Sequence, residues 1–314
     1  MVKITVIYPF CFGYVDNMIC ALQSRENTIV THIKYSEIRY KYKSVYERGK
    51  NFILKTCADR NLKKEYKTEV IKRKLANLER QDYILVIRPD LLTEDIFPYL
   101  RNKTRRLISY YFDAINNFPE KEKYIKYFDK VYSYEKDDVK KHNLEFITNY
   151  YSEFKKIDKP LEYSVYNISS YDKRFKHIQN IAKELKAKGS VYKFIVRKEK
   201  PVHCDYVEIT DQYIPLERTH KELKKALALL DIQKDNQKGL SFRVFEAMAL
   251  EKKLITTNED IVTYDFYNPN NILVLDLENI DIPLSFLNTP YDPLPEALVY
   301  KYSLANWINT VFES

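Results

Sequence analysis

Short runs of apolar and β-branched residues alternate with amphipathic segments along most of the chain, beginning with the run at residues 2–8. Such runs, bounded by turn-forming residues, are typical of strands buried on both faces of a sheet. The segments between them place apolar residues at helical spacing, as in 172–187, where Ile178, Ile181 and Leu185 fall on one face. The alternation predicts parallel βαβ units and an α/β fold.

The pattern predicts the following elements. Strands are expected at 2–8, 27–33, 83–87, 107–111, 130–134, 144–147, 163–168, 191–196, 204–209, 229–232, 253–256 and 272–275. Helices are expected at 15–25, 44–57, 62–80, 92–101, 120–126, 172–187, 217–228, 241–251 and 302–312.

The alternation is interrupted once, at the polar and non-periodic stretch 152–162, which contains Pro160. We therefore expect two Rossmann-like domains, one at 1–155 and one at 156–314, with the last helix packing back on the first domain. Open α/β sheets bind ligands at the carboxyl ends of their strands, so the cleft between the two halves is the expected active site.

Composition limits the class of protein. A chain of 314 residues with 28 Tyr, 16 Phe and only 4 Gly is globular rather than disordered or collagen-like. Its formal net charge of +8 suits anionic partners, which include nucleotide phosphates, phospholipid surfaces and nucleic acid. The four cysteines lack zinc-site spacing, and neither a signal peptide nor a membrane-spanning stretch is evident. We expect a cytoplasmic protein whose contact with a membrane is at most peripheral.

The most informative segment runs from Asp231 to Asn258. A strand is expected to end just before a polar loop, in which Gly239 allows a close backbone approach to a ligand. Ser241 is a good N-cap for the helix that follows. A helix N-terminus beside a glycine binds anions, and Lys238 and Arg243 add positive charge. Together these residues suit a diphosphate.

Glu246 lies about one turn after Arg243 on the same expected helix, among apolar residues. A carboxylate in such surroundings requires a polar partner, and a ribose diol would supply two hydrogen bonds to it. The alternative is a solvent-facing amphipathic helix on which Glu246 pairs with Arg243 or Lys253.

This run, G-L-S-x-R-x-x-E-A-x-A-L-x-K-K-L-I-T-T-N at 239–258, resembles the GT-B glycosyltransferases of bacterial lipopolysaccharide and capsule biosynthesis. The resemblance extends more loosely over 80–275. It implies two Rossmann-like α/β/α domains facing across a cleft, with Glu246 on the ribose and the preceding loop and helix start on the phosphates of a nucleotide sugar. Asn258 closes the matching run and is included among the expected donor contacts. Arg197 and Lys198 occupy the loop that meets the donor phosphates in that family, or else belong to a solvated run of charges.

One departure concerns the donor sugar. Many retaining members carry a second glutamate separated from the ribose glutamate by seven residues, and Lys238 occupies that position here.

An inverting reaction needs a base, expected from the N-terminal domain. Asp113 and Asp16 each follow an expected strand and are the candidates, although either could cap a helix instead. Arg88 follows another strand and could bind acceptor anions or pair with Asp90.

The sequence gives no strong metal or histidine motif. The five histidines are scattered, and we interpret them as structural or surface residues. The nearest D-x-D-like group, Asp276 to Glu278, follows a late strand, where a donor metal does not belong, so we expect a metal-independent enzyme without a cofactor.

Residues 39–48 (RYKYKSVYER) interleave tyrosine with cations. Such a patch can contact anionic lipid headgroups, stack on single-stranded nucleic acid, or simply be solvated. Our hypothesis is a transferase that moves a sugar from a nucleotide sugar to a glycan or lipid-linked acceptor at the inner face of the membrane, with no nucleic-acid partner. The alternatives are a non-catalytic nucleic-acid or regulatory binding protein that uses the basic surface, and a sugar epimerase on the same scaffold.

Overall fold

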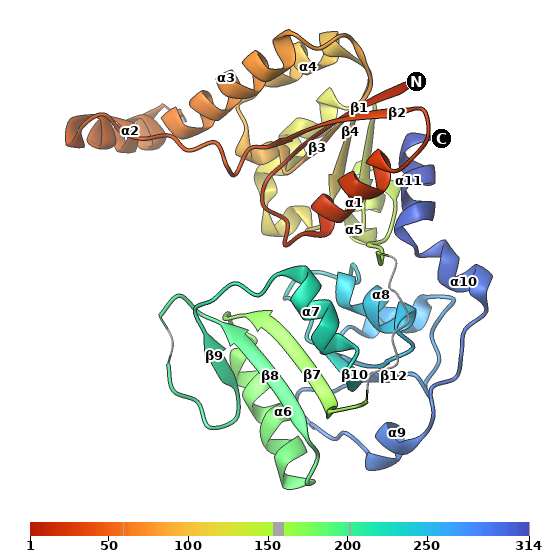
Figure 1. The fold of residues 1–314 in the computed structure, drawn as a ribbon. Coiled ribbons are helices and arrows are strands. Elements are labelled where there is room, and N and C mark those ends of the chain that lie inside the picture. The colour runs from red at the N-terminus through yellow and green to blue at the C-terminus, as the bar shows by residue number, and fades with distance from the viewer. Residues whose placement is uncertain (59, 153–159, 201, 314) are drawn as a thin grey trace. The chain divides into compact units, whose positions relative to one another are not determined.

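The computed structural model describes residues 1–58, 60–152, 160–200 and 202–313. The chain divides into two compact units, Met1–Ile147 and Thr148–Ser314, each built on a six-stranded parallel sheet (Figure 1). Two Rossmann-like units are what the sequence predicts. The predicted boundary between residues 155 and 156 lies outside the described residues.

The first unit contains β1 (Val2–Tyr8), β2 (Thr28–Lys34), β3 (Gln81–Ile87), β4 (Thr104–Tyr111), β5 (Lys130–Ser133) and β6 (Glu145–Phe146). Their order is β2-β1-β3-β4-β5-β6, and every neighbouring pair is parallel. The chain moves from β1 to one side of the sheet and then returns to the other, so the order reverses between β1 and β3. Ligands of such sheets bind outside the carboxyl ends of the strands at this point.

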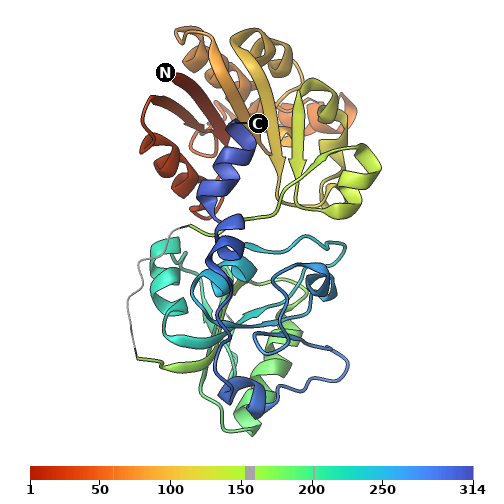
Figure 2. The same cartoon turned by 90° about the vertical axis from the view of Figure 1, so that its right-hand side faces the viewer.

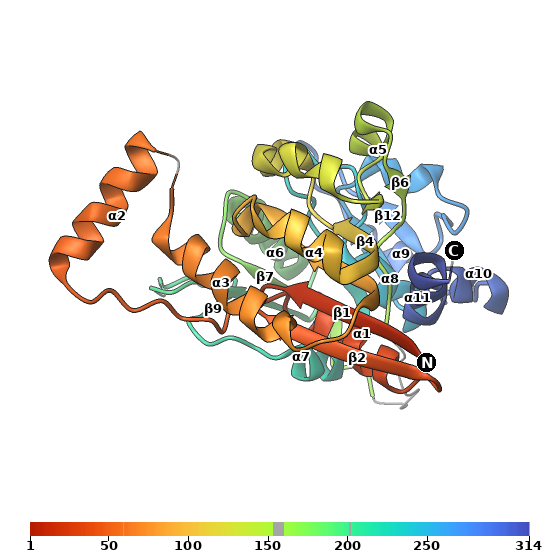
Figure 3. The same ribbon diagram turned by 90° about the horizontal axis from the view of Figure 1, so that it is seen from above.

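The helices of this unit are α1 (Tyr14–Gln23), α2 (Val45–Cys57), α3 (Leu62–Ala76), α4 (Ile96–Lys103) and α5 (Lys136–His142), with the 3₁₀ segments η1 (Pro89–Leu91), η2 (Ile115–Asn117) and η3 (Pro119–Tyr127). One face of the sheet packs on α3 through Ile71 and Leu75 and on α4 through Phe97 and Leu100. α1 lies on the opposite face (Figure 3). α2 covers neither face and projects from the end of α3 (Figures 1 and 3).

The second unit contains β7 (Tyr163–Ser170), β8 (Tyr192–Arg197), β9 (Glu208–Thr210), β10 (Ala226–Asp231), β11 (Lys253–Thr256) and β12 (Ile272–Val274). The parallel sheet has the order β12-β11-β10-β7-β8-β9, so here the order reverses between β7 and β10.

Helices cover both faces of the second sheet (Figure 2). α6 (Phe175–Ala187) and α9 (Leu284–Asn288) pack on one face, and α7 (Leu216–Leu223) and α8 (Phe242–Ala249) pack on the other. η4 (Glu259–Thr263), α10 (Glu296–Lys301) and α11 (Leu304–Phe312) complete the unit. α11 confirms the predicted C-terminal helix, while its packing on the first unit stays a prediction.

Several predicted elements were wrong in their bounds, including the helices expected at 62–80 and 92–101, which the structure has as α3 (Leu62–Ala76) and α4 (Ile96–Lys103). The helix expected at 217–228 ends at Leu223, and β10 already begins at Ala226. Alanine and leucine favour helices, but here they fill a strand buried at the centre of a sheet, where packing overrides propensity. The strand expected at 204–209 begins only at Glu208. Among the described helices, none is both long enough and apolar enough to cross a membrane.

Candidate functional site

The residues predicted to hold the donor all lie at the carboxyl edge of the second sheet. β8 ends at Arg197, β10 ends at Asp231 just before the loop to α8, and β11 ends at Thr256, two residues before Asn258. Because the strands are parallel, their carboxyl ends share one edge. The loop after β10 therefore lies beside the point where the strand order reverses, which is the expected ligand position.

The start of α8 is fixed by two hydrogen bonds through Ser241. Its Oγ accepts from the backbone N–H of Arg243 at 3.2 Å, which confirms the predicted N-cap. The same hydroxyl donates to Oδ1 of Asp231 at 2.8 Å. Asp231 is buried, and this burial raises the pKa of its carboxyl. The end of β10 thus orients the first turn of α8, where backbone N–H groups can meet an anion.

The loop between β10 and α8 is held by side-chain amides. Gln233 Nε2 donates to the carbonyl of Gln237 at 2.9 Å and to that of Gly239 at 3.2 Å. Asn258 Nδ2 donates to the carbonyl of Lys238 at 2.9 Å, and its Oδ1 accepts from the N–H of Asp260. The amide of Asn258, predicted to contact the donor, is thus engaged in shaping the loop. Lys238 itself is exposed.

Glu246 is 1% exposed, which rules out the solvent-facing alternative for this helix. Its Oε1 lies 2.8 Å from Nε2 of His220 on α7, and its Oε2 lies 2.8 Å from Nη1 of Arg243. The pairing with Arg243 that this alternative named is confirmed. A buried carboxylate beside one cation and one imidazole is held in a single orientation, with its charge balanced by Arg243.

His220 is the site residue that the sequence did not reveal. It lies 26 residues before Glu246 on another helix, and no motif links the two positions. Only the packing of α7 and α8 on the same face of the sheet brings them together. A structural role for His220 agrees with the interpretation of the five histidines as structural or surface residues, but that interpretation did not identify His220 as the residue that positions Glu246.

Arg197 and Lys198 are held less firmly. Arg197 is exposed, and its Nε donates to the carbonyl of Asp211 at 3.4 Å. The Nζ of Lys198 lies 3.8 Å from the centre of the Tyr171 ring, a cation–π contact. Both side chains lie at the predicted edge of the sheet, and no described contact aims either of them at the N-terminus of α8.

The first unit gathers its candidates at the corresponding edge. Asp16, in the first turn of α1, accepts from Tyr8 Oη at 2.8 Å and from Lys34 Nζ at 2.9 Å. Burial, together with the negative charges of Asp16 and Asp113 nearby, raises the pKa of the Cys11 thiol to about 12. Both predicted carboxylates are thus near the same buried thiol, but Asp16 is already in an ion pair.

Arg88 follows β3 directly and adopts the left-handed conformation, with φ of 56°. This conformation is uncommon for a residue other than glycine. Tyr35 Oη stabilises it by donating to the carbonyls of Ile87 and Arg88 at 2.9 and 3.0 Å. The guanidinium forms an ion pair with Asp90 at 2.8 Å and lies 3.8 Å from the centre of the Phe118 ring. Pairing with Asp90, one of the two predicted alternatives, is confirmed.

Lys121 on η3 is a buried cation that the sequence did not single out. Its Nζ donates to the carbonyl of Asp113 at 3.0 Å and lies within 5.1 Å of the centres of the Tyr111 and Phe118 rings. Burial lowers the pKa of this lysine to about 8, opposed in part by the charge of Asp113. The ammonium group of Lys121 therefore helps to hold the backbone of Asp113 in place.

Lys121→Met is expected to change how stability depends on pH. The pKa of Lys121 is about 8 in the folded chain and about 10.5 as its reference value, so the unfolded chain binds more protons between these values. The free energy of unfolding of the wild type should rise over this window by roughly 3 kcal/mol from this residue. The variant should lack that rise in urea titrations at pH 7.5, 9 and 10. An identical rise in both proteins would contradict the burial of a charged lysine.

Across the described ranges 1–58, 60–152, 160–200 and 202–313, no group of three or more His, Cys, Asp or Glu is placed to hold a metal ion.

No protein-family model matches the sequence, and no curated protein matches it. Solved structures do match. An alpha-glucosyltransferase in complex with UDP and a 13-mer DNA is similar over 97% of this chain and 96% of its own, with a TM-score of 0.63 and 10% identity. A UDP-forming trehalose-phosphate synthase from Burkholderia xenovorans is similar over 100% and 98%, with a TM-score of 0.55 and 11% identity.

The chain has the GT-B fold. A UDP-GlcNAc 2-epimerase from Methanocaldococcus jannaschii is also similar, over the full length of both chains, with a TM-score of 0.56 and 11% identity. At such low identities the likeness concerns the fold alone. Within the GT-B fold, the residues of the second unit gathered around α8 are those that the sequence assigned to the donor.

Proposed function

We propose that the protein is a glycosyltransferase that takes its sugar from a nucleotide sugar bound at the carboxyl edge of the second unit. The observation that carries this proposal is Glu246, a buried carboxylate on α8 held by His220 and Arg243. Burying a carboxylate is costly unless its oxygens have partners, and a fixed pair of oxygens is suited to a vicinal diol. The ribose of a nucleotide presents such a diol.

The donor diphosphate is assigned to the first turn of α8 and the loop before it. Gly239 and the Ser241 cap present backbone N–H groups, and Arg243 and Lys238 supply positive charge. Arg197 and Lys198 extend this charge at the end of β8. Asn258 contributes by holding the loop through the carbonyl of Lys238 rather than by touching the donor.

The acceptor side is assigned to the first unit. For an inverting reaction Asp113 is the favoured base, since it follows β4 at the carboxyl edge and Lys121 fixes its backbone. Asp16 is the second candidate, and it is less favoured because Lys34 and Tyr8 already engage its carboxylate. Arg88, with Asp90 as its counter-ion, would help to bind an anionic group of the acceptor.

The acceptor we propose is a growing surface glycan or a lipid-linked glycan of the lipopolysaccharide or capsule type. The reaction would take place at the cytoplasmic side of a bacterial inner membrane without a metal ion. The basic and tyrosine-rich residues 39–48 would provide peripheral contact with that membrane.

Thermal denaturation in the presence of nucleotides tests the proposal. A ligand that binds only the native state at about 100 times its Kd adds about 2.7 kcal/mol to the free energy of unfolding. For a unit of this size that corresponds to roughly 5–10 °C in Tm. We expect one of UDP, GDP, CMP or ADP, each of which carries the ribose diol, to produce such a shift without added metal. We would test UDP first, because UDP occurs in the names of all three similar structures described above.

The competing binding protein makes the opposite prediction in the same experiment. Generic DNA or RNA, rather than a nucleotide, should then raise Tm, and salt should abolish the effect. Stabilisation by nucleic acid alone would replace the transferase by that alternative.

A further inference from the structure

The helix α2 exposes a continuous apolar face. Val45, Tyr46, Phe52 and Ile53 are 88%, 83%, 72% and 61% exposed. Spacings of one, seven and eight residues place all four on one side of a helix, with Gly49 between them. Large apolar side chains are seldom exposed together in this way unless another surface covers them.

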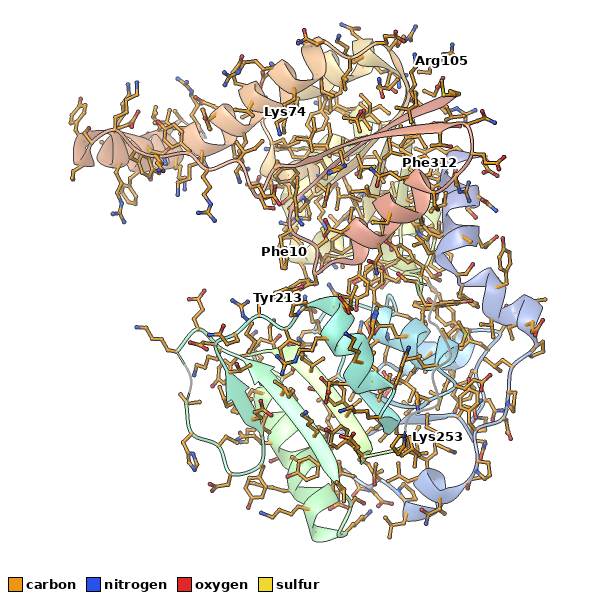
Figure 4. The ribbon with its side chains drawn as sticks, in the orientation of Figure 1. Phe10, Lys74, Arg105, Tyr213, Lys253 and Phe312 are labelled. Atoms are coloured by element: carbon orange, nitrogen blue, oxygen red, sulfur yellow. The ribbon has the colours of Figure 1, made fainter. Side chains whose placement is uncertain are left out.

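The opposite face of α2 is anchored, which fixes the direction of the apolar face. Asn51 is 3% exposed, donates to Tyr42 Oη at 2.8 Å and accepts from the N–H of Leu62 at 2.8 Å. Glu47 accepts from Tyr40 Oη at 2.7 Å and from the N–H of Lys43. Figures 1 and 3 show α2 projecting beyond the rest of its unit, and Figure 4 shows side chains extending from its free sides.

Positive charge borders this apolar face. Arg48 and Lys55 lie on one flank of the helix and Lys50 lies on the other, and all three are exposed. The segment before the helix adds three more exposed cations, Arg39, Lys41 and Lys43. Residues 39–57 thus contain six basic residues and a single acidic one, Glu47, whose carboxylate is engaged by Tyr40 and Lys43.

We propose that α2 docks on an anionic phospholipid surface, lying in the interface with its apolar face toward the acyl chains and its flanking cations at the lipid phosphates. An amphipathic helix of this kind binds through buried apolar area and attraction to anionic lipid together. The inference rests on the proposed function only in that both have the protein contact a membrane. It moves that contact from residues 39–48 to the apolar face of α2, and its test uses neither nucleotide nor sugar.

The combination of features favours lipid over other occupants. Nucleic acid would satisfy the cations but would leave Val45, Phe52 and Ile53 facing phosphates and water. A second copy paired across this face would bring Arg48, Lys50 and Lys55 close to the same cations of its partner, because a two-fold interface repeats each patch. An anionic bilayer surface satisfies both the apolar and the charged residues.

Flotation of the full chain with vesicles tests this. Wild type should bind vesicles of phosphatidylcholine with phosphatidylglycerol and should not bind phosphatidylcholine alone. Phe52→Gln combined with Ile53→Gln should weaken binding by at least about tenfold, because two large side chains no longer enter the interface. Gly49→Leu should strengthen it, since a side chain at Gly49 meets open space at the centre of the face. The matched control, Val191→Gln with Leu284→Gln, removes exposed apolar residues of the second unit and should bind like wild type.

A spectroscopic measurement separates insertion from loss of folding. Phe52→Trp should shift its emission to the blue on anionic vesicles, whereas the control Val191→Trp should not, and the native Trp307 is buried in both. The proposal is overturned if wild type ignores anionic vesicles, or if the Phe52/Ile53 variant binds them equally well. It is also overturned if that variant instead converts a dimer into a monomer in sedimentation, which would assign the face to a second copy.

Discussion

Glu246→Gln is expected to weaken binding of the stabilising nucleotide by about 10²–10⁴-fold. A hydrogen bond to a charged group contributes about 1.5–3 kcal/mol, and the carboxylate would make two of them to the ribose. The amide keeps the shape of Glu246 but can accept at only one atom and has no charge. Calorimetric titration of both proteins with the nucleotide identified by thermal denaturation measures the change.

The same substitution also affects folding, so a control is needed. Removing one partner of a buried pair costs up to about 3–5 kcal/mol, because Arg243 would then remain charged and unbalanced. Glu222→Gln is the matched control. Glu222 lies on α7, and its Oε2 is 2.8 Å from the Nζ of Lys193. This ion pair lies near the amino ends of β7 and β8, away from the expected ligand position. The Glu222→Gln variant should be less stable than wild type but should bind the nucleotide with the same affinity. Equal losses of affinity in both variants would mean that Glu246 acts only through folding.

Asp113→Asn is expected to lower the rate of sugar transfer by about 10²–10⁴-fold while leaving nucleotide affinity unchanged. The amide cannot accept a proton from the acceptor hydroxyl, yet it preserves the size of the side chain and the carbonyl that Lys121 binds. Single-turnover release of the nucleoside diphosphate from the nucleotide sugar measures the effect.

Asp16→Asn supplies the comparison for this prediction. Asp16 is engaged by Tyr8 and Lys34, so its loss should break the ion pair and reduce the rate by less than about tenfold. A large rate loss in Asp16→Asn together with a small one in Asp113→Asn would assign the base to Asp16. Small losses in both would favour a reaction that proceeds without a protein base.

The sequence predicted the layout of the fold because parallel strands buried on both faces are apolar runs of a recognisable length. It failed where a buried strand was made of helix-favouring residues, as at Ala226–Asp231. The pattern of Gly239, Ser241, Arg243 and Glu246 was also readable, since caps, charges and glycines act locally along the chain.

The partners of these residues could not be predicted, because they come from other elements. His220 reaches Glu246 from α7, and Asp231 reaches Ser241 from the end of β10. Lys121 is buried against the ring of Tyr111 at the end of β4 and that of Phe118 just before its own 3₁₀ segment, a packing that no local motif announces. For α2, the sequence showed the basic residues, but the direction of its apolar face is set by the contacts of Asn51 with Tyr42 and Leu62.

The central claim is that Glu246 holds the ribose diol of a nucleotide. Calorimetry with a ribonucleoside diphosphate and its 2′,3′-dideoxy analogue, on wild type and Glu246→Gln, tests it most directly. We predict that removing the diol weakens binding to wild type by at least about 10²-fold and has little effect on the variant, because the same hydrogen bonds are lost in each case. If the two proteins lose affinity equally for the dideoxy analogue, or if wild type binds neither ligand, Glu246 does not hold a ribose and the account is wrong.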